Sequence, residues 1–156
     1  MTLPDLCDKY PELIQVGKMN LKKFGGKDSL CGEIYTVSCS DDNSIIKKVL
    51  ASDGENKVLV IDASGVCHAS MIGDQIAESA AKNNWAGIVV NGYVRDVEEL
   101  QSLPIAIFAK GAVPQKTNKK DHGFEDILIS FGGTVMTSGK WIYVDQNGWL
   151  VADKKL

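Results

Sequence analysis

Arg95 and Asp96 stand side by side just after an apolar run and could together handle a small anionic substrate. The planar guanidinium of Arg95 suits a carboxylate or an enolate oxygen. The carboxylate of Asp96 offers the hard oxygen ligand that magnesium or manganese accepts while keeping several of its waters. Adjacent side chains on an extended segment point in opposite directions, so we expect Arg95 and Asp96 not to form an ion pair with each other. An ordinary ion pair at a strand end is the simpler alternative for such a dipeptide.

A second segment, Gly73-Asp74-Gln75-Ile76, opens a stretch with helical periodicity. The first N–H groups of a helix lack intrahelical partners and carry the positive end of the helix dipole. Such a helix start is suited to binding an anion. A plain glycine-capped helix start without a ligand is the alternative.

A βαβ unit is the arrangement that would bring these two segments together. The apolar run KVLVIDA (57–63) predicts a strand buried on both faces, residues 73–84 a helix, and Ile88-Val89-Val90 the next strand. Because the strands of such a unit are parallel, the helix start and the turn after the second strand lie at one sheet edge. We therefore predict a carboxylate on the helix amides, with the Arg-Asp pair contacting the rest of the molecule.

The remaining elements indicate one α/β domain, predicted over residues 1–156. We find no repeat, no low-complexity tract and no linker. The sequence predicts a helix near 3–10, a strand over 29–39 with Gly32 as a possible bulge, a loop over 64–70, a helix from Ile45 that stops at Gly54, a short acidic helix over 97–100, strands over 105–109 and 127–133, a polar loop over 114–122, and a hairpin of 141–145 and 149–153 closed by the Asn147-Gly148 turn.

Composition excludes several classes of protein. The chain has 156 residues, 44% of them hydrophobic and 24% charged, which is typical of a globular domain rather than a disordered chain. A net charge of −3 argues against direct binding of nucleic acid, which requires clustered positive charge. No apolar run is long enough for a membrane helix and no secretory signal is visible, so we expect a cytoplasmic protein with no membrane partner. Its four cysteines are expected to be reduced packing residues: Cys7, Cys31, Cys39 and Cys67.

Other polar residues give weaker signals. The two histidines, His68 and His122, are expected to be structural or exposed to solvent. The lysines of the 114–122 loop, together with Lys110, are expected to be solvated rather than catalytic. Asp62 closes a buried strand, and a role in the site and a role in capping the next loop are equally open.

Longer stretches of the chain resemble a known family. They are GDQIAESAAKNNWAGIVVNGYVRDVEEL (73–100), LCDKYPEL near the start, Phe24-Gly25-Gly26, KVLVIDASG, and the closing FGG…SGKWIYVDQNGWLVAD. Together they are similar to the RraA-like family, which contains regulator of ribonuclease activity A and the 4-hydroxy-4-methyl-2-oxoglutarate aldolases. The resemblance implies a swivelling β/β/α sandwich assembled as a homotrimer, with sites at subunit boundaries.

In aldolase-like members, the resemblance implies a divalent metal, Mg²⁺ or Mn²⁺, and a 2-oxo diacid substrate. The reaction would be retro-aldol cleavage to pyruvate, with decarboxylation of oxaloacetate as a second activity. The positions that match are Gly73, Asp74, Gln75 and Ile76 for the substrate carboxylate, Arg95 for the keto or enolate oxygen, Asp96 for the metal, and Asp74 as a possible proton relay. Arg95 and Asp74 are therefore the expected catalytic residues.

The regulator branch implies a different function: a protein without chemistry of its own that binds the endonuclease RNase E and inhibits it. Asp96 favours a working metal site and hence the lyase. Against this, longer aldolases carry a C-terminal extension with further acidic residues, whereas this chain stops at Leu156. The lyase is therefore the leading hypothesis from the sequence, and inhibition of RNase E is the alternative.

Overall fold

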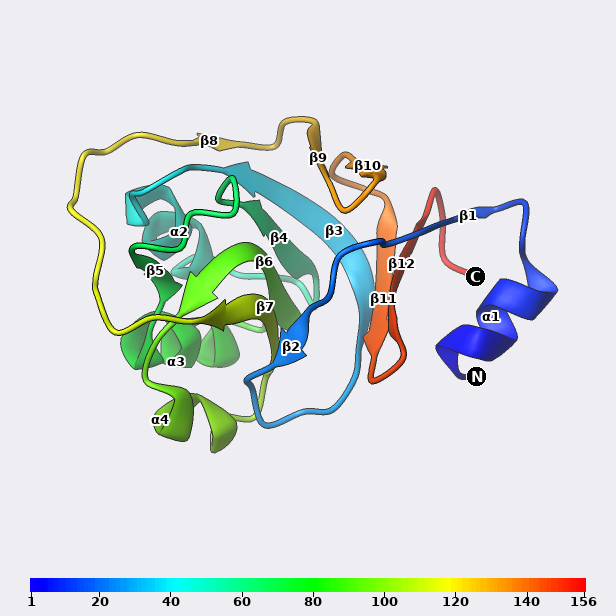
Figure 1. Cartoon of the computed structure of the whole chain (residues 1–156), viewed down its shortest axis with the longest axis horizontal. Coiled ribbons are helices and arrows are strands. Elements are labelled where there is room, and N and C mark those ends of the chain that lie inside the picture. The colour runs from blue at the N-terminus through cyan, green and yellow to red at the C-terminus, as the bar shows by residue number, and fades with distance from the viewer.

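The computed structural model describes all residues, 1–156, as a mixed α/β fold (Figure 1). The elements, in chain order, are α1 (Leu3–Lys9), β1 (Ile14–Val16), β2 (Lys22–Lys23), β3 (Leu30–Ser38), α2 (Ser44–Leu50), β4 (Val58–Asp62), β5 (Ser70–Ile72), α3 (Asp74–Lys82), β6 (Gly87–Val94), α4 (Val97–Gln101), β7 (Ala106–Ala112), β8 (Phe124–Glu125), β9 (Ile129–Phe131), β10 (Thr134–Met136), β11 (Trp141–Asp145) and β12 (Gly148–Ala152). No helix is long and apolar enough to cross a membrane.

Most strands belong to one sheet with the order β1-β12-β11-β3-β4-β6-β7-β2. The central strands β3, β4, β6 and β7 run parallel to one another, whereas β11, β12 and β1 add to β3 in antiparallel pairs. In Figure 1, α2, α3 and α4 gather beside the parallel strands, and α1 lies at the far end of the molecule near β11 and β12. The parallel part of the sheet is therefore the part that carries the predicted βαβ unit.

The central strands are buried on both faces, as their continuous apolar runs predict. In β6, Ile88 and Val90 belong to the core on the helix side, and Val89 belongs to a second core that includes Ile142 and Trp149. Helix α3 presents the small side chains of its predicted stripe to the first core, with Ala77 and Ala80 fully buried. Small residues at these positions let the helix approach the sheet closely.

Three local predictions need correction. The predicted loop over 64–70 is confirmed for 64–69, but Ser70 begins strand β5, which the sequence did not predict because three buried residues are too few to show periodicity. Gly32 is no bulge: it pairs in regular register with Ile142, and a Cβ there would lie 2.8 Å from a methyl of Val58. The hairpin of β11 and β12 exists, but Asp145 pairs with Gly148, so Gln146 and Asn147 form its loop.

The cysteines are free, as predicted, but only some of them pack. Cys39 is buried and Cys7 is partly buried, whereas Cys31 and Cys67 are exposed. The expectation of four packing residues was therefore wrong for Cys31 and Cys67, which lie at an exposed position of β3 and in the loop before β5.

Candidate active site

The loops that follow β5 and β6 meet at one point, and they carry the residues predicted from the sequence. Strand β5 pairs in parallel with the end of β6, and the backbone N–H of Arg95 donates to the carbonyl of Ile72 at 2.9 Å. The N–H of Asp74, the first residue of α3, donates to Oδ2 of Asp96 at 3.0 Å. Two segments separated by a helix and a strand in the sequence are thus joined by hydrogen bonds.

Asp96 has a left-handed backbone, with φ 58° and ψ 46°. In this conformation the Asp96 carboxylate points toward Arg95 and the start of α3, and Nε of Arg95 lies 4.0 Å from Asp96 Oδ2. The prediction that the two side chains point apart was wrong, because it assumed an extended segment. Aspartate is one of the few residues other than glycine that visits the left-handed region readily.

Glycine is needed at position 73 for steric reasons rather than for its backbone conformation. Its φ of −122° and ψ of −172° are open to any residue. A Cβ at this position, however, would lie 2.9 Å from Asp96 Oδ2 and 3.5 Å from Arg95 Nε. The absence of a side chain at Gly73 therefore lets the carboxylate and the guanidinium approach the start of α3.

The helix start offers fewer amides than the sequence suggests. The Asp74 N–H is occupied by Asp96, and the Gln75 N–H donates to the Asp74 side chain at 2.9 Å. No side chain accepts from the N–H of Gly73 or of Ile76, and the first hydrogen bond into the helix comes from Ala77. The carboxylate of Asp74 thus takes one of the helix-start N–H groups that the sequence predicted to be free for an anion.

These residues line a cavity of about 360 Å³. It is formed by α2, the start of α3, the turn after β6 and the 116–119 segment, and its lining residues are Asn43, Lys47, Ala51, Ser70, Gly73, Asp74, Gln75, Ile76, Ser79, Arg95, Asp96, Lys116, Thr117 and Lys119. All six residues predicted from the sequence are among them. We call it the site cavity.

Positive charge exceeds negative charge in the site cavity. Its charged side chains are Arg95 and three lysines against the two carboxylates of Asp74 and Asp96, in a chain whose net charge is −3. Two of these lysines, Lys116 and Lys119, were expected to be merely solvated. Sequence reasoning missed them because a polar loop carries no periodicity, and only its pairing with β5 brings it to the cavity.

Other residues singled out in the sequence lie elsewhere. The side chain of His68 is 67% exposed, with Nε2 3.9 Å from a carboxylate oxygen of Asp41, and His122 is exposed. Asp62 caps its loop, because its Oδ1 accepts from Ser64 N–H and Asn91 Nδ2. None of these three lines the site cavity.

The site cavity offers few side chains that could bind a metal ion. No group of three or more His, Cys, Asp or Glu side chains is arranged to hold a metal ion. Asp96, whose side chain is 33% exposed, keeps its Oδ1 free of hydrogen bonds while Oδ2 accepts from Asp74. A single free carboxylate oxygen fits Mg²⁺ or Mn²⁺, which retain most of their water, but not a metal that needs a full protein cage.

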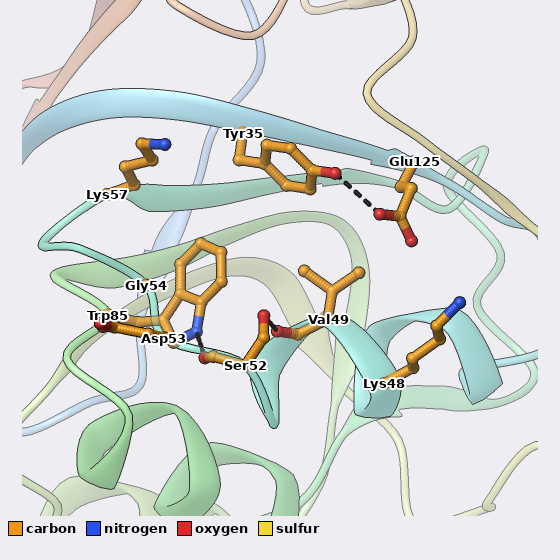
Figure 2. Close-up of a pocket in the computed structure, with 9 residues that line it drawn as sticks. All are labelled: Tyr35, Lys48, Val49, Ser52, Asp53, Gly54, Lys57, Trp85 and Glu125. Atoms are coloured by element: carbon orange, nitrogen blue, oxygen red, sulfur yellow. Dashed lines mark hydrogen bonds between the residues drawn. The ribbon is translucent and has the colours of Figure 1, made fainter.

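A second cavity of about 240 Å³ lies beside the C-terminal end of α2 (Figure 2). In Figure 2 the hydroxyl of Tyr35 points to Glu125, to which it donates at 2.8 Å, and the indole N–H of Trp85 donates to the Ser52 carbonyl at 3.0 Å. Burial, with the hydrogen bond to Glu125, raises the pKa of Tyr35 to about 12. Apart from Lys48, the charged and hydrogen-bonding side chains of this cavity have partners within the protein, so we do not assign it a ligand.

Fold and site together define an α/β protein with a cationic cavity at the carboxyl edge of its parallel strands. A model of the RraA-like family, described as Aldolase/RraA, matches residues 3–151. A protein of Pseudomonas paraeruginosa named as a putative 4-hydroxy-4-methyl-2-oxoglutarate aldolase is 42% identical over 153 residues, covering 98% of this chain and 94% of that protein. A protein of Azotobacter vinelandii with the same name is also 42% identical over the same shares.

Two solved structures are similar over 100% of this chain at 33% identity. The structure named S-adenosylmethionine:2-dimethylmenaquinone methyltransferase from Geobacillus kaustophilus has a TM-score of 0.97, and the match covers 97% of that protein. The RNA-processing inhibitor RraA from Thermus thermophilus has a TM-score of 0.96, and the match covers 94% of that protein. The chain belongs to the RraA-like family, and the predicted family and α/β fold are confirmed. Because the names of these relatives imply different functions, the function must be argued from the site.

Proposed function

We propose that the protein is a divalent-metal-dependent lyase that cleaves 2-oxo diacids of the 4-hydroxy-4-methyl-2-oxoglutarate type and also decarboxylates oxaloacetate. The observation that carries this proposal is the convergence of Arg95, Asp96 and the start of α3 on one positively charged cavity. The aldolase names of relatives at 42% identity support the same reaction class.

Both reactions break the bond between C3 and C4 of a 2-oxo acid. In the retro-aldol reaction the C4 hydroxyl loses its proton, C4 becomes a carbonyl, and the bonding pair passes into the enolate of pyruvate. In the decarboxylation, carbon dioxide leaves from C4 and the C3–C4 bonding pair likewise passes into the enolate of pyruvate. Protonation of the enolate at C3 then gives pyruvate. The charge that develops on the C2 oxygen is the feature that the site must stabilise.

Arg95 is the side chain assigned to that oxygen. Its guanidinium makes no hydrogen bond within the protein, and its one ion-pair contact is with Asp96 at 4.0 Å. The N–H groups at the start of α3 would receive the C1 carboxylate. Asp74, whose carboxylate lies at the same helix start, would orient a water molecule or relay the proton.

Asp96 is the residue assigned to the metal. A bound Mg²⁺ or Mn²⁺ would polarise the C2 carbonyl as a Lewis acid and help neutralise the enolate. The hydrogen bond from the Asp74 N–H fixes one oxygen of Asp96, and this leaves the other oriented for a cation.

A homotrimer in the cytoplasm is part of the same proposal, taken from the family resemblance. The site cavity is open to solvent in the single chain, so a neighbouring subunit would help to exclude water from it. Light scattering after gel filtration tests the trimer.

The second candidate function is inhibition of RNase E by direct binding. It is favoured by the 33% identity and full coverage shared with the RNA-processing inhibitor RraA. A pull-down with the basic C-terminal region of RNase E tests it, and absence of salt-sensitive binding at micromolar protein would exclude it.

The lyase is tested by pyruvate formation from 4-hydroxy-4-methyl-2-oxoglutarate and from oxaloacetate, coupled to lactate dehydrogenase. We expect pyruvate from both substrates with Mg²⁺ or Mn²⁺ and none above background after chelation. Pyruvate formation no faster than in buffer with the same metal would refute the lyase.

A further inference from the structure

The site cavity holds more positive charge than the oxo-acid end of a substrate requires. Besides Arg95 it is lined by Lys47, Lys116 and Lys119. Neither Lys47 nor Lys116 forms an ion pair or a side-chain hydrogen bond within the protein, whereas the neighbouring Lys120 pairs with Asp41 at 2.7 Å. Cationic groups that line a cavity without an anionic partner favour an anionic ligand.

The two loop lysines are held by a segment that we call the strap, residues 113–123. Near Lys116 the strap is joined to β5, because the Ser70 N–H donates to the Gln115 carbonyl at 2.8 Å. Ser70 and Lys116 also form an isolated parallel bridge. The backbone that carries Lys116 is thus tied to the strand that leads directly into Gly73.

Asn43 provides a second attachment beneath the strap. It is 9% exposed, and its Nδ2 donates to the Met71 carbonyl at 3.1 Å. Its Oδ1 accepts from the buried Thr117 hydroxyl at 3.0 Å and from Nζ of Lys119. One buried amide therefore connects the strap to β5.

The far end of the strap is attached through a buried carboxylate. Asp42, 1% exposed, accepts from the His122 N–H at 2.9 Å and from the N–H and hydroxyl of Ser44. Burial alone would raise the pKa of Asp42, but these hydrogen bonds hold it below its usual value. Asp42 therefore stays charged at neutral pH, and the strap is attached at three places along its length.

We propose that Lys116 and Lys119 of the strap, with Lys47 of α2, bind the second carboxylate of a dicarboxylic 2-oxo acid. The inference rests on the proposed function in one respect, the placement of the oxo-acid end at Arg95 and Asp96. The lysines then determine specificity: a substrate that lacks the distal carboxylate leaves three cations of the cavity without an anionic partner.

Binding of a matched pair of uncleavable ligands tests the subsite without catalysis. 2-Oxoglutarate and 2-oxopentanoate share a five-carbon chain and an oxo-acid end, and only the first has a distal carboxylate. With Mg²⁺ present, we expect calorimetry to show about tenfold tighter binding of 2-oxoglutarate. Lys116→Gln and Lys119→Gln should each reduce this preference severalfold, and Lys116→Arg should largely keep it.

Lys48→Gln is the matched control. Lys48 neighbours Lys47 on α2 and is likewise exposed, but it lines the second cavity. The preference for 2-oxoglutarate should remain in this variant. Equal binding of the two ligands by the unmodified protein, or a preference unchanged in both Lys→Gln variants, would overturn the subsite.

A cleavage assay separates the subsite from the proposed function. We expect kcat/KM for 4-hydroxy-2-oxoglutarate to exceed that for 4-hydroxy-2-oxopentanoate, and Lys116→Gln to lower the ratio. A lysine-dependent binding preference without any pyruvate formation would support the subsite and refute the lyase. Cleavage of both substrates with a ratio indifferent to Lys116 and Lys119 would refute the subsite alone.

Discussion

The two cavities beside α2 differ in how their polar groups are paired. In the second cavity, Lys57 lies 3.8 Å from Glu33 and 3.6 Å from Glu55, in addition to the hydrogen bonds of Tyr35 and Trp85. Asp53 accepts from the Glu55 N–H and from Asn84, so Lys48 is the one charged group lining this cavity that has no partner within the protein. Most polar groups of the second cavity are therefore satisfied without a ligand.

The site cavity differs because more of its charged groups are without a close partner. The guanidinium of Arg95 has only the Asp96 carboxylate, at 4.0 Å, and the ammonium groups of Lys47 and Lys116 and Oδ1 of Asp96 form no hydrogen bond within the protein. Volume distinguishes the cavities only modestly, at about 360 Å³ against about 240 Å³. Unpaired charge is the stronger indicator of a ligand, since such groups gain most when an oppositely charged molecule binds.

The largest expected effect comes from removing the guanidinium of Arg95, which forms no hydrogen bond within the protein. Arg95→Ala should lower kcat/KM for oxaloacetate by roughly 10²–10³-fold, the range for loss of one donor to a developing oxyanion. The matched change in the second cavity, Lys57→Ala, should leave kcat/KM within about twofold, because exposed ion pairs contribute little. Both are measured by the coupled pyruvate assay. A comparable loss in the two variants would show that the contrast between the cavities has no functional meaning.

Asp96→Asn tests the metal without disturbing the turn. Asparagine also tolerates the left-handed backbone, and its Oδ1 can accept the Asp74 N–H, but it is uncharged. We expect Mn²⁺ affinity, measured by calorimetry, to fall by roughly 10- to 100-fold. The control is Asp53→Asn in the second cavity, which should bind Mn²⁺ as the unmodified protein does. Unchanged Mn²⁺ affinity in Asp96→Asn would remove the metal assignment.

The fold could be predicted from the sequence wherever the pattern is local. The run over β4, the alanine stripe of α3 and the glycine before that helix each predict their element, and together they define the edge at which Arg95 and Asp96 lie. Strand β5 was missed, because three buried residues have no detectable period.

The site was predicted less completely, for the same physical reason. Its six predicted residues follow from one helix start and one strand end. The left-handed turn at Asp96 and the approach of Lys116 and Lys119 depend on partners distant in the sequence, namely Asp74 for the first and Ser70 and Asn43 for the others. Contacts of that kind leave no trace in local spacing.

Asp74→Asn sharpens the comparison within the site cavity. An asparagine oxygen can still accept the Gln75 N–H, so the variant removes only the charge that lies where a substrate carboxylate would bind. We expect KM for oxaloacetate to fall by about two- to fivefold, as for loss of one exposed like-charge contact. If Asp74 also relays a proton, kcat should fall in the same variant. A higher KM with unchanged kcat would show that Asp74 assists binding instead.

The smallest effect is expected in the second cavity, from Tyr35→Phe. Because burial and Glu125 raise the pKa of Tyr35 to about 12, the folded protein holds this proton more tightly than the unfolded chain, in which a tyrosine has a pKa of about 10. The resulting contribution to the free energy of unfolding is complete below pH about 10 and is lost as the pH rises toward 12. Urea unfolding should therefore show a steeper loss of stability between pH about 10 and 12 in the unmodified protein than in Tyr35→Phe. At pH 7 the variant should lose about 1 kcal/mol with its hydrogen bond to Glu125 and keep its lyase activity. Equal slopes would mean that the tyrosine is as free to ionise in the folded protein as in the unfolded chain, and the second cavity would then no longer count as internally paired.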